Sequence, residues 1–160
     1  MSNRANTSKG PGVYFPPPLV YIIIFIIAVF FQNELPISRT VFQMQATKYA
    51  GTLFVLIALF FIISGLRQFF RSKNTLILIK PATSLQKSGI YAMSRNPMYC
   101  GLAIAYLGIT CFIGSWWNII LFPILILICQ EYIIKREEKY LELEFGEQYI
   151  EYRRKVRRWF

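Results

Sequence analysis

Apolar residues in this chain gather into long runs, and polar, mostly basic stretches separate them. With their flanking residues, four runs predict membrane-spanning helices at 15–32, 49–67, 97–113 and 116–134. A helix needs roughly 20 residues to cross the hydrocarbon core of a bilayer. The first and third runs are short by this measure and must recruit flanking residues. The pattern therefore predicts an all-α fold, a polytopic bundle of about four transmembrane helices.

The length of 160 residues predicts one domain over residues 1–160. Outside the apolar runs, the remaining segments are polar. Residues 1–12 look like a disordered tail, and a loop is expected over 68–96. A helical tail is expected over 135–160, with Gly146 as a break or bend.

The positive charges indicate how the bundle is oriented. Lys and Arg are frequent in the loop 68–96 and the tail 135–160, whereas the first loop holds only Arg39 and Lys48. Because cytoplasmic loops are enriched in Lys and Arg, the basic loop and tail are expected in the cytoplasm, and four crossings place both termini there. A net charge of +10 combined with this hydropathy indicates anionic lipid as the partner, and not nucleic acid.

The composition excludes several kinds of chemistry. The chain has no His and no Asp, which rules out a His general base, a Ser-His-Asp triad and a His-built metal site. Cys100, Cys111 and Cys129 lie inside apolar runs at spacings that match no zinc or disulfide framework, so we expect them to be packing residues. No metal is expected.

A first candidate site lies just before the third apolar run. Gly89 permits unusual backbone geometry, and Pro97 suits a helix start with Asn96 as its N-cap. The free amides of this helix start, beside Arg95, would bind a carboxylate or phosphate. The alternative is an ordinary capped transmembrane helix with a snorkelling arginine.

A second candidate is the acidic group after the fourth run. Glu131 follows apolar residues and is expected near membrane depth, where carboxylates are usually functional. Glu138 is seven residues further on, which places both on one face of a regular helix. With Glu137, such carboxylates would hold a cation or a ribose diol. The alternative is a solvated helix end with an ion pair between Glu131 and Lys135.

The basic C-terminus allows two readings that are compatible with each other. The stretch from Arg153 to Phe160 suits an electrostatic anchor on anionic lipid, with Trp159 and Phe160 at the interface. An arginine here would also suit an anionic substrate head group.

Taken in order, these motifs resemble the bacterial branch of the isoprenylcysteine carboxyl methyltransferase family, which is related to the phospholipid N-methyltransferases. The motifs are Pro11-Gly12 with Pro16-Pro17-Pro18, Ser88-Gly89-Ile90-Tyr91, Ser94-Arg95-Asn96-Pro97-Met98-Tyr99-x-Gly101, Arg136-Glu137-Glu138-x-Tyr140-Leu141-Glu142, Phe145-Gly146-Glu147-x-Tyr149-x-x-Tyr152 and Val156-Arg157-Arg158-Trp159. They cover nearly the whole chain from Pro11 onward.

The resemblance implies an S-adenosylmethionine-dependent methyltransferase in a bacterial inner membrane, with its active site on the cytoplasmic side and no Rossmann domain. It implies a cofactor site formed by Gly89, Tyr91, Arg95, Asn96, Pro97, Tyr99, Gly101, Glu137 and Glu138. Of these, Arg95, Asn96 and Glu138 are the expected catalytic residues. Glu131, Tyr149, Tyr152 and Arg154 are expected on the substrate side.

Two departures from the family pattern concern the substrate. Ile90 stands where the family often has Pro, and Asn96 stands where the characterised eukaryotic enzymes have His. Asn forms hydrogen bonds but does not titrate near neutral pH. A carboxylate acceptor needs no base, which favours carboxyl methylation of a lipidic or small hydrophobic acceptor entering from the bilayer. A phospholipid amine is the alternative acceptor.

Two other classes of function remain open at this level. Sterol reductases share a related C-terminal helical arrangement by resemblance, although they are usually longer and bind a nicotinamide cofactor. The chain is also compatible with a non-catalytic helical module that docks a partner through its basic tail.

Overall fold

The fold is an all-helical bundle, as the apolar pattern predicts. In a computed structural model, residues 12, 16–71 and 84–159 are described. The predicted disordered tail 1–12, apart from Gly12, and residues 72–83 of the predicted loop 68–96 lie outside these residues. The helices are α1 (Pro17–Glu34), α2 (Thr40–Gln43), α3 (Gln45–Arg71), α4 (Pro97–Ile113), α5 (Trp116–Ile128), α6 (Lys135–Phe145) and α7 (Glu147–Lys155).

Three helices are long and apolar enough to cross a membrane, and a fourth is shorter. The long ones are Pro17–Glu34, Gln45–Gln68 and Trp116–Phe145, and the shorter one is Pro97–Ile113 with 17 residues. A length of 17 residues is the lower end of the range for a crossing. Large apolar side chains on their outer faces, such as Ile26 and Phe60, are exposed, as lipid-facing residues are. The chain is an integral membrane protein.

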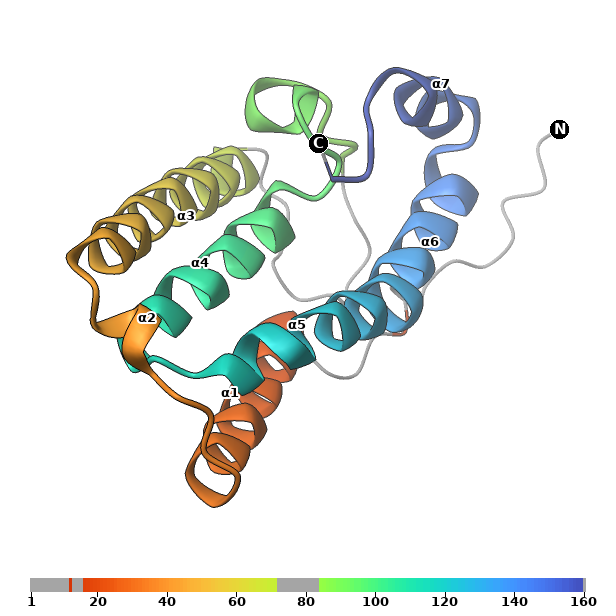
Figure 1. Cartoon of the computed structure of the whole chain (residues 1–160). Helices are drawn as coiled ribbons and strands as arrows, with labels where there is room; N and C mark the ends of the chain where they lie inside the picture. The colour runs from red at the N-terminus through yellow and green to blue at the C-terminus, as the bar shows by residue number, and fades with distance from the viewer. Residues whose placement is uncertain (1–11, 13–15, 72–83, 160) are drawn as a thin grey trace, which may run out of the picture.

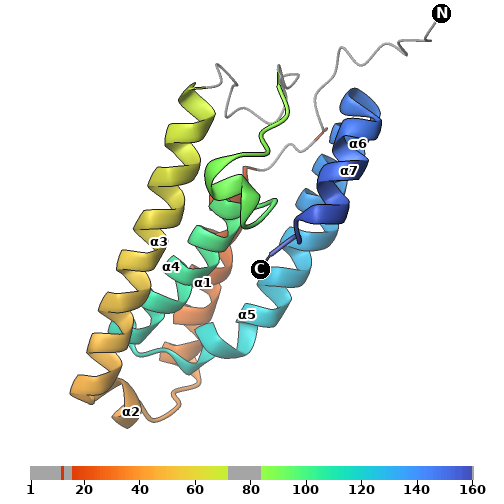
Figure 2. The same cartoon turned by 90° about the horizontal axis from the view of Figure 1, so that it is seen from above.

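Helices α3 and α4 pack side by side through a stripe of small residues (Figure 2). Gly51, Ala58 and Gly65 recur every seven residues on α3, and Gly101 and Gly108 do so on α4. A Cβ at Gly101 would lie 2.7 Å from Ile62 Cγ1 and 3.2 Å from the Ala58 carbonyl oxygen. The two backbones therefore approach too closely for a side chain at this position.

At the end of the bundle that carries α2, indole and amide side chains fix the turns. Gln32, buried in α1, donates to the Ile37 carbonyl and accepts from the Trp116 amide. Trp116 and Trp117 donate their indole N–H groups to the carbonyls of Ser38 and Leu35. Trp at a membrane interface commonly has an apolar ring in lipid and a satisfied N–H.

The fourth apolar run and the acidic segment form one continuous helical rod that changes pitch. A π-helical segment, η2 (Cys129–Ile134), joins α5 to α6. Because a π-helix turns less per residue than an α-helix, residues on opposite sides of η2 do not keep α-helical phase. Beyond α6, Gly146 with a φ of 54° reverses the chain into α7, which runs back toward the start of α4 (Figure 1).

Two apolar clusters lie between the helices. One joins Tyr21 of α1, Tyr106 of α4, Leu125 of α5 and Ile133 of η2, and the other joins Phe61 of α3 to the loop before α4. Trp159, near the C-terminus, packs against both clusters. Cys100 and Cys129 are buried in these clusters as free thiols, in agreement with the packing role expected for them.

Candidate functional site

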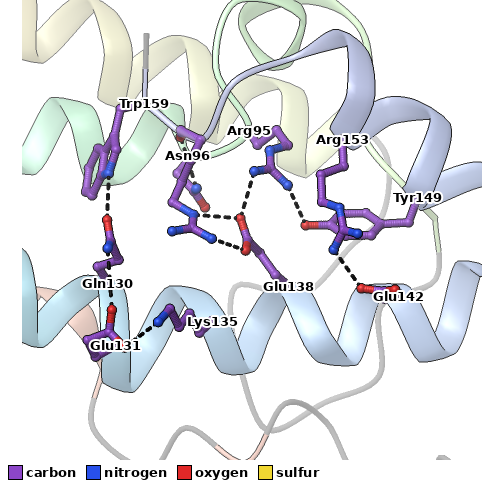
Figure 3. A network of polar contacts seen from close by, with 11 residues as sticks. Arg95, Asn96, Gln130, Glu131, Lys135, Glu138, Glu142, Tyr149, Arg153 and Trp159 are labelled. Carbon is purple, nitrogen blue, oxygen red and sulfur yellow. Dashed lines mark hydrogen bonds and ion pairs between the residues drawn. The ribbon is translucent and has the colours of Figure 1, made fainter.

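Three segments that are distant in sequence meet at the basic end of the bundle. They are the loop 94–96 before α4, the first turn of α6, and residues 156–159, here called the C-terminal strap. Figure 3 shows that side chains from all three converge on Glu138.

Glu138 is the centre of the polar cluster, and two arginines hold it. Arg158 donates from Nε to Oε1 at 2.9 Å and from Nη2 to Oε2 at 2.6 Å, and Arg95 Nη2 lies 3.1 Å from Oε1. The Glu138 side chain is 11% exposed and the Arg95 side chain 9%. With both oxygens engaged and little water contact, Glu138 fixes the positions of the two guanidinium groups.

Arg95 is held from a second side and keeps one donor free. Its Nη1 donates to the Tyr149 hydroxyl at 3.1 Å, and Tyr149 is itself buried. Burial is the main cause that raises the pKa of Tyr149 to about 12, so this phenol stays neutral. Arg95 Nε is buried and has no hydrogen-bond partner in the described part of the chain. A buried N–H without a partner is costly, and an anionic ligand would satisfy it.

The C-terminal strap attaches to the loop mainly through its backbone carbonyls. The Arg95 amide donates to the Arg157 carbonyl at 3.0 Å. The Arg158 carbonyl accepts from Ser94 Oγ and from Asn96 Nδ2, both at 3.1 Å. Asn96 occupies the N-cap position of α4 as expected, but its side chain makes no capping bond and holds the strap instead.

Glu137 forms a separate contact beside this cluster. The Tyr99 hydroxyl donates to Glu137 Oε2 at 2.9 Å. The helix Trp116–Phe145 is longer than a crossing needs, and its apolar part ends at Ile134. Glu137 therefore lies in the polar extension, outside the part that crosses the membrane. Burial raises the pKa of Glu137 to about 7, and the neighbouring Glu138 adds to the rise while the Tyr99 hydrogen bond opposes it. This carboxyl group therefore changes charge near neutral pH.

The loop before α4 is supported by side chains of α7. Gly89 is the first residue of the short 3₁₀ helix η1 (Gly89–Ala92). Its φ of 60° lies in the left-handed region, which glycine adopts without strain. Tyr152 donates its hydroxyl to the Tyr91 carbonyl at 2.6 Å. Tyr149 and Tyr152, expected on the substrate side, thus act on the loop that carries Arg95. Pro97 is buried at the first turn of α4.

Three expected site residues lie elsewhere. Gly101 faces α3, where helix packing accounts for it. The π-helical segment η2 separates Glu131 from the regular helix of Glu138. Glu131 is half exposed and forms an ion pair with Lys135, which was the alternative considered for it. Its Oε1 accepts from Gln130, which in turn accepts from the Trp159 indole of the strap (Figure 3). Arg154 is exposed at the end of α7.

Sequence reasoning missed four members of this cluster: Ser94, Gln130, Arg158 and Trp159. Three of them lie within motifs that carry the family resemblance, which was the available signal, but their partners are far away in sequence. No group of three or more potential metal ligands occurs among the described residues.

Comparison with known proteins places the chain in a family. Residues 46–148 match the family profile described as phospholipid methyltransferase. Over 65 residues, or 39% of this chain, it is 42% identical to an uncharacterized protein of Haemophilus influenzae, covering 98% of that protein. Over 72 residues, or 45% of this chain, it is 38% identical to the protein-S-isoprenylcysteine O-methyltransferase of Schizosaccharomyces pombe, of which it spans 30%.

No solved structure matches the chain. The resemblance drawn from the ordered motifs is confirmed by the profile and by the Schizosaccharomyces pombe relative. Since the profile covers more than half of the sequence, this integral membrane protein belongs to the phospholipid methyltransferase family.

Proposed function

We propose that the chain transfers a methyl group from S-adenosylmethionine to a lipidic or small hydrophobic acceptor, with a carboxyl group as the favoured acceptor. The observation that carries the proposal is the buried donor Arg95 Nε, which has no partner among the described residues. Glu137, the neighbour of the Glu138 that holds Arg95, adds a carboxyl group with a raised pKa. Arg95 and Glu137 both lie where the apolar helices α4 and α5 meet the polar end of the bundle. Family membership favours this class over a reductase or a docking module.

The residues present fit the charged groups of this cofactor. The carboxylate of the cofactor would accept a hydrogen bond from Arg95 Nε. Its ribose hydroxyls or its ammonium group would donate hydrogen bonds to the Glu137 carboxylate. When bound, S-adenosylmethionine supplies a sulfonium whose methyl carbon is the electrophile of an in-line displacement. The chain's own task is then alignment: Glu138 and Tyr149 hold Arg95, and Asn96 holds the strap against the loop.

The chemistry of the acceptor separates two candidates. A carboxylate is already a nucleophile at neutral pH and needs no base. A phospholipid amine must first lose a proton, and Glu137, with a pKa of about 7, is suited to accept one. The raised pKa of Glu137 keeps the amine as the second candidate, with Glu137 as the base.

The site is proposed to face the cytoplasm of a bacterium. The described end with Arg95, Arg136 and Arg158 is far more basic than the other end, where Arg39 and Lys48 lie. Because Lys and Arg are enriched on the cytoplasmic side of membrane proteins, the site belongs on that side.

The proposal is tested by incubating the reconstituted protein with S-adenosylmethionine labelled in its methyl group and a bacterial lipid extract. We expect label in the organic phase, released by mild base if the product is a methyl ester and retained if it is a methylated amine. Glu138→Gln is expected to abolish transfer. Glu142→Gln, which removes an exposed pairing with Arg153 on the same helix, is the matched control. Equal transfer by Glu138→Gln and wild type would refute the assigned site.

A further inference from the structure

The basic C-terminal end of α7 lies close to the start of α4, where the apolar part of α4 begins. Helix α6 continues the rod beyond its apolar part, Gly146 then reverses the chain, and α7 runs back. Figure 1 shows the segment after α7 ending beside the start of α4. The Arg157 carbonyl accepts from the Arg95 amide, two residues before α4 begins at Pro97.

Three positive charges gather there without an ionic partner. Arg154, Lys155 and Arg157 are exposed, and in the described part of the chain no carboxylate forms an ion pair with any of them. We call these three residues the basic cluster. The neighbouring Arg153 differs, because it is paired with Glu142. The proposed binding of S-adenosylmethionine uses none of the three, although Arg154 is also the arginine expected on the substrate side, so their charge is available to another ligand.

The surroundings of the basic cluster favour lipid over a soluble acidic partner. Met93 is 58% exposed, and the next residue, Ser94, donates to the Arg158 carbonyl of the strap, so the loop that holds the strap carries a large exposed apolar side chain. Positive charge next to exposed apolar surface suits the boundary between head groups and acyl chains. At that depth, anionic phospholipids are the abundant source of negative charge.

We propose that Arg154, Lys155 and Arg157 bind the phosphate groups of anionic phospholipids in the same membrane and thereby hold the C-terminal strap against the loop that carries Arg95. The strap begins one residue after Lys155 and contains Arg157, so a lipid bound there restrains the strap directly. Loss of anionic lipid loosens the strap and with it the Arg158 contact to Glu138. The effect on catalysis rests on the proposed function, but lipid binding and strap closure do not.

Lipid binding is tested on the detergent-purified full chain by native mass spectrometry with phosphatidylglycerol and phosphatidylcholine in equal amounts. A basic residue near an anionic surface contributes roughly a fivefold preference, so we expect phosphatidylglycerol to be retained at least about tenfold over phosphatidylcholine. The triple variant Arg154→Gln/Lys155→Gln/Arg157→Gln should lose this preference. Equal retention of the two lipids by wild type would overturn the proposal and leave the cluster to a protein partner.

A matched control removes the same charge elsewhere. Arg39→Gln/Lys48→Gln/Lys139→Gln takes three exposed positive charges from outside the cluster and should keep the wild-type lipid preference. If this control loses the preference as fully as the cluster variant does, net charge alone explains the binding and the proposal fails.

Strap closure is tested without cofactor in nanodiscs of phosphatidylcholine alone or mixed with phosphatidylglycerol. Hydrogen exchange of the Arg95 amide, which is bonded to the Arg157 carbonyl, reports the opening of the strap. We expect exchange to be several-fold slower with phosphatidylglycerol, and equal in the two nanodiscs for the cluster variant. Bound lipid with unchanged Arg95 exchange in the wild type would overturn the coupling. Because no cofactor is present, this outcome is distinct from a failure of the methyltransferase proposal.

Discussion

Replacing Glu138 by Gln should release the C-terminal strap from the loop that carries Arg95. The substitution removes the negative charge between two guanidinium groups and turns one acceptor oxygen into an amide donor that faces an arginine. Arg158 loses a bidentate contact, with bonds of 2.9 and 2.6 Å, and Arg95 loses its contact at 3.1 Å.

The expected magnitude follows from the burial of these groups. Breaking a fully buried ion pair costs about 3–5 kcal/mol, and the 27% exposure of Arg158 reduces this by solvent screening. We therefore expect about 2–3 kcal/mol, or roughly a 30- to 150-fold shift toward the open strap. The pair between Arg153 and Glu142, with side chains 43% and 40% exposed, should be worth about 0–1 kcal/mol.

The assay uses Trp159, which packs against both apolar clusters when the strap is closed. In a background of Trp116→Phe/Trp117→Phe, Trp159 is the remaining tryptophan, and acrylamide quenching of its fluorescence measures strap opening. Quenching should rise strongly in Glu138→Gln and little in Glu142→Gln. If the two variants are quenched equally, the cluster around Glu138 does not hold the strap and the reasoning is refuted.

Three further predictions concern the pH response, the helix packing and the loop. Glu137 has a pKa of about 7, so its carboxylate becomes protonated as pH falls from 8 to 6. The affinity for S-adenosylhomocysteine, measured by calorimetry, should therefore drop about tenfold over this range. The Glu137→Gln variant should show no such drop. Gly101→Leu should lower the melting temperature of the protein in detergent, because overpacking costs about 1–3 kcal/mol or more. Ala46→Leu, on the exposed surface of α3, should not lower it. Equal melting temperatures of the two variants would contradict the close approach of α3 and α4. Tyr152→Phe leaves the buried Tyr91 carbonyl without its donor and should cost about 1–3 kcal/mol in thermal or denaturant unfolding, so an unchanged stability would contradict that bond.

Local signals were sufficient to predict much of the fold. Pro97 starts α4 because proline is preorganised for a helix start, and Gly114 and Gly146 end helices in left-handed conformations that other residues resist. The apolar runs identify the lipid-facing helices because hydropathy acts over whole segments. The short helix α2 carries no comparable signal and was not predicted.

The site could be predicted only in part, because its decisive contacts are long-range. The periodicity of hydrophobic residues does not show that the Arg158 carbonyl accepts from Ser94 and Asn96. Nor does it show that the Arg158 guanidinium donates to Glu138. A change of helical pitch such as η2 is equally invisible in the hydrophobic pattern. Gly101 was expected at the cofactor because the motif contains it, while its packing against α3 depends on the path of a different helix.

The measurement that tests the central claim most directly is calorimetric titration of S-adenosylhomocysteine into the purified full chain, with Glu138→Gln and Glu142→Gln alongside. The account predicts saturable binding by wild type and by Glu142→Gln, and weak or no binding by Glu138→Gln, since Arg95 loses the charge that positions it. Absence of binding by folded wild-type protein, or equal affinity in all three, would contradict the assignment of the cofactor site to the cluster around Glu138.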